Sequence, residues 1–290
     1  GVTRVDDVKN LPVAIEDAIK DVSFFNWPVI VKPVDSAGSK GVTRVDDVKN
    51  LPVAIEEALS EAHNGHFIIE DFLTFKGYHS SADAFTVDGE LKFCTYSDQL
   101  FDKNADNPYT PTKIIWPSSM EKADQDYLTY ETQRLMRLLD MKTGIYNIET
   151  CVGADGKPYI MEVSPRGGGC KIAEIQQLAS GINLIEAEVK KAVGEFVGEI
   201  HQPEFDGIWI EYVIHSEGDT SGIFKELKID PKIKEKHVKV IDMTTKPGDL
   251  VEPFTGANKA LGDMFLRFDT REEMDRIMND TSEWLQIVLE

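Results

Sequence analysis

Two short apolar segments that each carry one glutamate constrain the fold of this chain more than any other feature. They span residues 145–152 and 159–163, and the turn signal Asp155-Gly156 lies between them. Both are rich in β-branched and aromatic residues, so we expect two strands that pair as a hairpin. Glu149 and Glu162 have the same phase, which directs both side chains to one face. The apolar neighbours indicate burial, and two carboxylates buried together require a cation.

The residues that follow the second strand add to this face. Ser164 and Arg166 lie two and four positions after Glu162, and three glycines come next. Magnesium takes oxygen ligands, so Glu149 and Glu162 are the predicted metal ligands, and Ser164 shares their face. Arg166 is expected to hold a transferring phosphoryl group or a carboxylate substrate. The alternative is an exposed hairpin whose acidic face is solvated.

A second candidate region lies near the N-terminus. The run Trp27–Pro33 predicts a strand that carries Lys32 near its end, and a polar, glycine-bearing loop follows. Backbone N–H groups of such a loop can contact phosphate oxygens, glycine allows close approach, and lysine adds a point charge. The alternative is a glycine turn in a hairpin. The candidate phosphate-binding residues are Lys32, Ser36, Gly38, Ser39 and Gly41.

A third candidate region begins where a predicted strand over 67–69 ends in acidic residues. Its backbone groups could pair with the edge of an adenine base, and an apolar side chain could cover the ring. The alternative is a strand end that faces water. The candidate residues are Glu70, Asp71, Phe72 and Leu73.

Composition limits the classes of partner. The chain has 290 residues, of which 41% are hydrophobic and 28% charged, with a formal net charge of −20. This balance predicts a globular protein, and the charge disfavours nucleic acid and anionic membrane surfaces. Neither a membrane span nor a signal peptide is recognised. The three cysteines form no CxxC pair, which disfavours zinc and a disulfide framework and favours a reducing cytoplasm.

The remaining patterns predict a mixed α+β chain. A helix is expected after Asn50, a hairpin over 85–93 turning at Asp88-Gly89, and an amphipathic helix over 123–140 that Gly144 closes. Two helical patterns broken at Gly181 follow the glycines. Thr270 with Glu273 predicts a capping box that opens a last helix.

An internal duplication bears on domain organisation. The sixteen residues GVTRVDDVKNLPVAIE occur at 1–16 and again at 41–56. They represent either a duplicated unit or an artefact at the N-terminus, and the second copy fits its context better. We therefore expect an uncertain segment over 1–20, a small lobe over 21–75, a central metal-binding lobe over 76–202 and a C-terminal α+β lobe over 203–290.

Taken together and in order, three motifs resemble the ATP-grasp superfamily. They are PVIVKPVDSAGSKGV, IIEDFL, and GIYNIET with PYIMEVSPRGGG, within residues 27–195. The resemblance implies two α+β lobes that hold ATP between antiparallel sheets. It implies that Lys32 and the loop over 36–41 contact the phosphates, Glu70 and Leu73 meet adenine, Glu149 and Glu162 hold magnesium, with manganese as another suitable ion, and Arg166 stabilises an acyl-phosphate step.

The tail from Leu250 to Ile277 is similar to that of amino-acid ligases in this superfamily. The resemblance therefore implies a carboxylate–amine ligase that forms an acyl phosphate and releases ADP. Its partners would be a small carboxylate and an amine, and a homodimer is compatible with the family. Two other hypotheses stay open, a bicarbonate-activating enzyme and an ATP-binding module without catalysis.

Three departures from the family pattern are visible. Ser164 stands where the family usually has an asparagine that binds the metal, so the resemblance implies that Ser164 is the third metal ligand. The usual ribose-binding glutamate is not obvious, and His79 is the nearest candidate for that role. The N-terminal substrate-binding domain of the family is not recognised in this chain.

Overall fold

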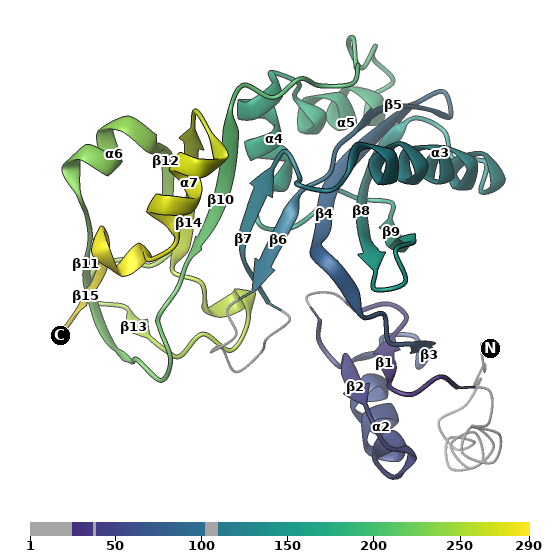
Figure 1. Cartoon of the computed structure of the whole chain (residues 1–290), viewed down its shortest axis with the longest axis horizontal. Coiled ribbons are helices and arrows are strands. Elements are labelled where there is room, and N and C mark those ends of the chain that lie inside the picture. Colours follow the sequence, from purple (N-terminus) through teal and green to yellow (C-terminus); the bar gives the residue numbers. More distant parts are fainter. Residues whose placement is uncertain (1–24, 37–38, 102–109) are drawn as a thin grey trace. The chain divides into compact units, whose positions relative to one another are not determined.

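The structure is a computed structural model that describes residues 25–36, 39–101 and 110–290. The predictions for residues 1–20 and for Gly38 therefore lie outside the described residues. The chain divides into two compact units, Gly1–Thr74 and Phe75–Glu290 (Figure 1). None of the described helices is both long enough and apolar enough to cross a bilayer.

The first unit is a small antiparallel sheet with one helix on it. Strand β1 lies between β2 and β3. Val29 and Val31 are fully buried and pack with Leu51 and Ile55 of α2, as expected from the alternation of buried and half-buried residues along β1. Each such buried aliphatic side chain contributes about 1.5–3 kcal/mol. The described elements are β1 (Val29–Pro33), β2 (Thr43–Val45), the 3₁₀ helix η3 (Val48–Asn50), α2 (Leu51–Glu61) and β3 (Phe67–Asp71).

The second unit is built on a larger antiparallel sheet. Its described strands run in the order β12-β14-β10-β7-β6-β4-β8-β9, and β5 pairs with β4. A smaller sheet has the order β13-β11-β15. The strands are β4 (Phe75–Val87), β5 (Glu90–Cys94), β6 (Asp98–Phe101), β7 (Pro111–Trp116), β8 (Gly144–Gly153), β9 (Pro158–Ser164), β10 (Ile208–Ile214), β11 (Gly222–Ile229), β12 (Val238–Met243), β13 (Leu250–Val251), β14 (Gly262–Phe268) and β15 (Leu285–Leu289). The helices are α3 (Lys122–Leu138), α4 (Ile172–Ser180), α5 (Leu184–Ala192), α6 (Pro231–His237), α7 (Arg271–Met278), η4 (Ala257–Lys259) and η5 (Thr281–Glu283).

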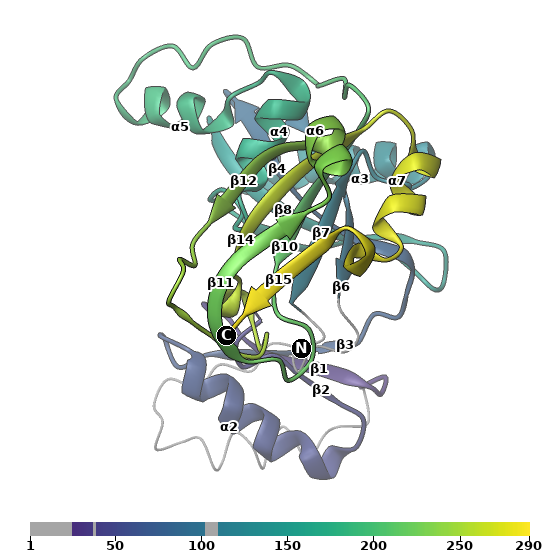
Figure 2. The same ribbon diagram turned by 90° about the vertical axis from the view of Figure 1, so that its left-hand side faces the viewer.

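Helices cover both faces of the larger sheet (Figures 1 and 2). Helix α4 packs on β7, β10 and β14 around Trp116 and Phe265, and α5 packs beside it around Phe85. On the opposite face, α3 packs through Leu128 and Met136 on β4 and β8. The smaller sheet and α7 cover the rest of that opposite face. The α4 face also carries polar residues of β4 and β8, with Ser81 opposite Glu149 and Asp83 opposite Asn147.

Several predicted elements are confirmed. The turn at Asp88-Gly89 joins β4 to β5, with φ values of 51° and 82° that suit a tight hairpin. Helix α2 begins after Asn50, and α4 ends at Gly181 in the left-handed conformation. The Thr270 hydroxyl accepts from the backbone N–H of Glu273 at the start of α7.

Two predictions of element ends are wrong. Helix α3 ends at Leu138, and the residue that closes it is Asp140 with φ 52°, not Gly144. The backbone N–H of Met141 reaches back to the carbonyl of Met136, as in a helix closed by glycine, and Gly144 instead starts β8 opposite Thr86. Strand β4 starts ten residues before the predicted Phe85, at Phe75. Its first half is polar and therefore lacks the apolar alternation that identifies strands.

The region 203–290, expected as an appended lobe, shares the sheet of the preceding region. Strand β10 pairs with β7, and β14 and β12 continue outward from β10. Only the smaller sheet, with β13, β11 and β15, stands apart from this order. The domain boundaries at 20, 75 and 202 remain predictions.

Candidate functional site

In the first unit, two of the predicted nucleotide-binding residues, Lys32 and Glu70, share the face of the small sheet away from α2. Lys32 follows the buried Val31 in β1, so its side chain lies on the uncovered side. Glu70 of β3 is on the same side, and the Lys32 Nζ is 2.6 Å from its Oε2. With side-chain exposures of 23% and 45%, this pair is accessible to a ligand. The structure therefore brings together two of the residues predicted to contact a nucleotide.

The residues after Glu70 lie beside the same strand. Asp71 accepts two hydrogen bonds from Asn26, one of them from the side-chain amide at 2.9 Å. The Arg44 guanidinium lies 4.7 Å from the centre of the Phe72 ring. Phe72 and Leu73 are half-buried. The Phe72 ring and the Arg44 guanidinium next to Glu70 are groups on which a planar heterocycle can stack.

The predicted phosphate loop is held at both of its described ends. The Asp35 carboxylate accepts backbone hydrogen bonds from His63 and Asn64 at 2.9 and 2.8 Å. At the other end, Gly41 has φ +68°, and a Cβ there would lie 3.0 Å from the Cβ of Glu61. Gly41 is therefore required for packing against α2, a role that the sequence did not reveal. Ser39 also has a positive φ, of 58°.

In the second unit, the two predicted metal-binding glutamates face each other. Strands β8 and β9 pair so that Glu149 lies directly opposite Glu162, and Asn147 lies opposite Ser164. A bulge at Met161 breaks the alternation, since the register jumps from Glu162 to Ile160. The bulge lets Ile160 and Val163 both pack toward α3 while Glu162 stays on the other face.

These acidic residues belong to a polar row that crosses three strands. Opposite Glu149 on β4 is Ser81, and opposite Asn147 is Asp83. The Ser164 hydroxyl donates to Glu162 Oε1 at 2.7 Å, which orients that carboxylate. Glu149 is half-buried and Glu162 exposed. Among the described residues no three His, Cys, Asp or Glu side chains gather into a metal site. Two carboxylates and a hydroxyl suit magnesium, which is commonly held by one or two carboxylates together with phosphate oxygens and water.

Arg166 lies just outside β9 and not on it. The strand ends at Ser164, and Arg166 is exposed in the following loop, where its Nη1 donates to the carbonyl of Gly167 at 2.9 Å. The expected alternation with Glu162 and Ser164 therefore does not extend to Arg166, because Pro165 ends the strand. Arg166 nonetheless remains at the end of the polar row, since its charge acts on Asp83.

Asp83 is a candidate that the sequence did not single out. It is fully buried, and its Oδ1 accepts from the backbone N–H of Gly168 at 2.7 Å and from the Asn147 amide at 3.1 Å. Its Oδ2 is buried without a hydrogen-bond partner. Burial raises the pKa of Asp83 to about 6, although Gly168, Asn147 and Arg166 each oppose the rise. The sequence did contain a signal for it, because Ser81 and Asp83 alternate with Ala82 and Ala84, as expected of a strand with one polar face.

Within the glycine run after Arg166, Gly168 is the residue that this contact requires to be glycine. A Cβ on Gly168 would lie 2.7 Å from the Asn147 amide nitrogen and 3.0 Å from Asp83 Oδ1. Only glycine lets the backbone come close enough for its N–H to reach the buried carboxylate. The loop is thereby fixed to the polar row.

His79, the candidate for ribose binding, lies on β4 opposite Gln99 of β6. Its ring packs against Phe75 at 4.0 Å between centres and against Phe101 at 5.9 Å. Burial lowers its pKa, so the imidazole is neutral at neutral pH. A neutral imidazole between aromatic rings can still form a hydrogen bond with a hydroxyl group.

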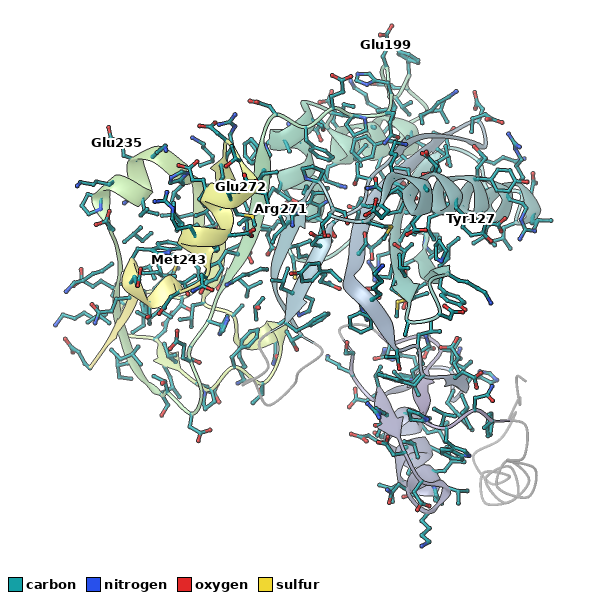
Figure 3. All side chains as sticks on the ribbon, in the orientation of Figure 1. Tyr127, Glu199, Glu235, Met243, Arg271 and Glu272 are labelled. Carbon is teal, nitrogen blue, oxygen red and sulfur yellow. The ribbon has the colours of Figure 1, made fainter. Side chains whose placement is uncertain are left out.

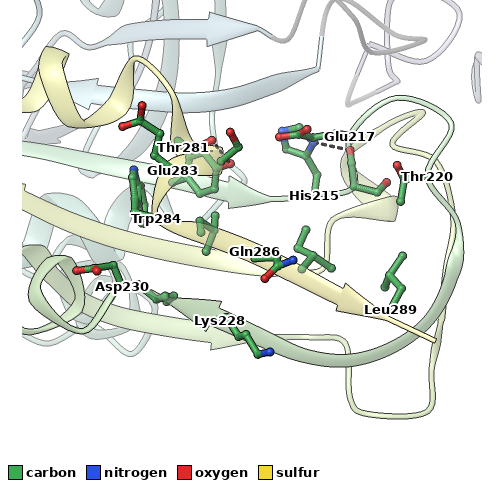
Figure 4. Close-up of a pocket in the computed structure, with 16 residues that line it drawn as sticks. His215, Glu217, Thr220, Lys228, Asp230, Thr281, Glu283, Trp284, Gln286 and Leu289 are labelled. Atoms are coloured by element: carbon green, nitrogen blue, oxygen red, sulfur yellow. Dashed lines mark hydrogen bonds between the residues drawn. The ribbon is translucent and has the colours of Figure 1, made fainter.

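A cavity of ≈ 700 Å³ lies elsewhere in the second unit (Figure 4). It is lined by the end of β10 and by η5 and β15, with His215, Lys228 and Trp284 among the lining residues. None of the predicted site residues lines it. The Tyr212 side chain, which also lines it, points away from the α4 face of β10.

Comparison with known proteins places these features in context. Residues 25–174 match the family described as the ATP-grasp domain. A search of curated protein sequences returned no significant match.

Solved structures resemble the whole fold. Phosphoribosylglycinamide synthetase from Anaerococcus prevotii has a TM-score of 0.68 at 18% identity, over 99% of this chain and 68% of that one. L-amino acid ligase from Bacillus licheniformis has 0.74 at 22%, over 94% and 66%. The biotin carboxylase domain of Hydrogenobacter thermophilus 2-oxoglutarate carboxylase, solved with MgADP and bicarbonate, has 0.73 at 15%, over 95% and 60%. The chain thus spans about two thirds of their length or somewhat less.

Proposed function

The chain belongs to the ATP-grasp family, and from this premise we propose that it is an ADP-forming ligase that joins a carboxylate to an amine. ATP would transfer its γ-phosphoryl group to the carboxylate oxygen, which gives ADP and an acyl phosphate. The amine nitrogen would then attack the acyl carbon, form an amide bond and release inorganic phosphate. The observation that carries the proposal is the opposition of Glu149 and Glu162 across β8 and β9, next to the loop of Arg166.

Roles follow from the charges and positions of the residues. Glu149, Glu162 and the Ser164 hydroxyl would hold magnesium or manganese, which when bound would neutralise phosphate charge. Arg166, exposed at the end of the polar row, can pair with the carboxylate substrate or the transferring phosphoryl group through its guanidinium. Either partner of Arg166 carries negative charge on its oxygens, and this charge requires a positively charged group beside it during transfer.

Most of the residues proposed for the nucleotide belong to the first unit, and His79 belongs to β4. Lys32 supplies a positive charge for the phosphates, and it would exchange its pairing with Glu70 for a phosphate oxygen. Ser36, Ser39 and the backbone near Gly41 would contact the phosphates. Glu70, Asp71, Phe72 and Leu73 would bind the base, and His79 the ribose.

The products of turnover test this proposal. With MgATP, a panel of small acids and amino acids, and hydroxylamine as the amine, the active carboxylate should give a hydroxamate together with ADP and phosphate in equal amounts. Formation of AMP and pyrophosphate would show a different mechanism. The panel also identifies the acyl donor.

A bicarbonate-activating enzyme is a second candidate, which the similarity to a biotin carboxylase domain solved with bicarbonate favours. It predicts ATP hydrolysis that depends on bicarbonate and needs no other acid. A third hypothesis, a nucleotide-binding module without catalysis, predicts calorimetric binding of MgATP with no turnover on any acid. All three cysteines are free, which agrees with the proposed cytoplasmic location. A homodimer remains part of the proposal.

A further inference from the structure

The loop that carries Arg166 ends in an unusual backbone conformation. Cys170 and Lys171 are consecutive non-glycine residues with φ values of 49° and 53°. Residues with a Cβ rarely adopt this left-handed region, and such residues persist only where surrounding contacts hold them. Lys171 is also the residue that precedes the first turn of α4. Contacts of the neighbouring residues must therefore hold Cys170 and Lys171 in this conformation.

The Lys171 ammonium is held by two aspartates from neighbouring strands. It forms an ion pair with Asp242 of β12, and its Nζ is 3.8 Å from Asp263 Oδ2 of β14. Asp242 and Asp263 lie opposite each other in the sheet. The lysine side chain is 28% exposed and that of Asp263 16%, so the contact with Asp263 is partly shielded from solvent and from salt.

A third acid lies behind this pair. Glu211 of β10 is fully buried, and no donor among the described residues reaches either of its carboxylate oxygens. Burial raises the pKa of Glu211 well above its ordinary value, and the Asp263 charge raises it further. The raised pKa favours the protonated form of Glu211, which can donate its proton to Asp263. This fixes the orientation of the Asp263 carboxylate that faces Lys171.

The other end of the loop is held by a separate contact. Gly168 donates its N–H to Asp83, as described above. Between these two anchors lie only Gly169 and Cys170, while Arg166 is two residues before the first anchor. The Cys170 thiol packs with the apolar residues under α4, and burial raises its pKa to about 12, so it stays neutral and contributes no charge of its own. The loop thus has one anchor on β4 and one on β12 and β14.

We propose that Lys171, held by Asp242 and Asp263, is a positioning residue that fixes the loop 166–169 and thereby the location of Arg166. The inference rests on the proposed function for what Arg166 does, but not for the anchoring itself. Removal of the anchor would free the strained corner, weaken the Gly168–Asp83 hydrogen bond and spread the positions available to Arg166. Carboxylate binding would weaken, whereas nucleotide binding, assigned to other residues, would not.

The test compares Lys171→Met and Asp242→Asn with Lys171→Arg, in the full chain. Hydrogen exchange of the Gly168 amide should be about tenfold faster in Lys171→Met and Asp242→Asn than in the wild type. In Lys171→Arg, which keeps the positive charge, it should equal the wild-type rate. Lys225→Met, which removes an exposed ion pair with Glu290, is the matched control and should leave this amide unchanged.

Kinetics supply the readout that separates positioning from general stability. With the acid found by the hydroxamate panel, Lys171→Met should raise the KM for that acid about tenfold and leave the KM for ATP unchanged. Asp242→Asn keeps the test open if Lys171→Met does not fold. Unchanged Gly168 exchange in both variants would overturn the proposal, and so would an equal rise in both KM values. If wild type shows no turnover, accelerated exchange alone still supports the anchor, and the proposed function is what fails.

Discussion

Two buried aspartates on the larger sheet are partnered very differently. Asp98 of β6 accepts from the Ser118 hydroxyl and the Ser119 N–H on one oxygen, and from both terminal nitrogens of Arg271 at 2.8 Å on the other. Asp83 of β4 has donors on one oxygen only, and its Oδ2 has none. Asp98 lies on the face that α7 covers, where Arg271 begins the helix (Figure 3), and Asp83 lies on the α4 face.

The difference suggests how a buried carboxylate that stabilises the fold can be distinguished from one that belongs to a candidate site. A buried carboxylate whose acceptor sites are occupied holds elements together, here α7 and the sheet. A buried carboxylate that keeps an unpartnered oxygen and a raised pKa is a less stable arrangement, and such arrangements gather at functional sites. Asp83 lies on the same face as Glu149 and Glu162, in line with Asn147 and Ser164. We therefore expect activity at the α4 face and stability at the α7 face.

The largest effect should come from the acid pair. Glu162→Gln is expected to lower ligase turnover about a thousandfold, or about 4 kcal/mol, because one metal ligand is weakened next to the transferring phosphate. Stability to urea should change little, since Glu162 is exposed. Steady-state ADP release and urea unfolding measure both. A stability loss equal to the activity loss would erase the contrast between the two faces.

The second effect concerns the partnered aspartate. Arg271→Ala leaves Asp98 buried with an unpaired charge, and we expect a loss of about 3–4 kcal/mol in the free energy of unfolding. Turnover per folded molecule should be preserved. A loss below about 1 kcal/mol, as found for surface pairs, would show that this network does not stabilise the unit.

The third effect is a pH dependence at Asp83. Its pKa in the folded protein, about 6, is above the ordinary value of 3.8. The folded state therefore binds the proton more tightly, and the associated stability is present below pH 3.8 and is lost as pH rises through about 6. Relative to Asp83→Asn, the wild type should lose about 2–3 kcal/mol between pH 4 and pH 7. Parallel pH profiles of the two proteins would contradict the raised pKa.

The smallest effect provides the baseline. Lys225 pairs with Glu290 on the surface, with exposures of 54% and 64%. Lys225→Met should change the free energy of unfolding by less than about 0.5 kcal/mol. A larger change would mean that charge substitutions perturb this acidic chain non-specifically, and the comparison of faces would then need charge-neutral variants.

The sequence predicted most where a local pattern controls the outcome. The pairing of Glu149 with Glu162 was predicted from phase and a turn signal, although the bulge at Met161 is what brings the two residues opposite each other. The hairpin at Asp88-Gly89 followed from turn chemistry. Asp83 could not be found this way, because its partner Gly168 is 85 positions away in the chain. The anchors of Lys171 depend on β12 and β14, whose positions in the sheet no local pattern encodes.

Local patterns also failed where one residue type replaced another. Asp140 adopts the left-handed conformation that glycine usually supplies, so the end of α3 was misplaced. Strand β9 ends at Ser164, before Pro165, so the alternation that placed Arg166 on the strand does not extend to it. Both are single-residue changes in backbone conformation that a period-two pattern cannot show.

The most direct test of the account follows one oxygen atom. The carboxylate found by the hydroxamate panel is labelled with ¹⁸O at both oxygens, and the ligation is run with unlabelled ATP and an amine. If an acyl phosphate forms, one labelled carboxylate oxygen bridges the acyl carbon and the phosphorus. The amine attacks the acyl carbon and breaks its bond to this oxygen, which therefore leaves on the released phosphate. We predict one ¹⁸O per phosphate in the wild type, and about a thousandfold slower acid-dependent phosphate release in Glu162→Gln. Phosphate without label from the wild type would contradict activation of a carboxylate by this chain.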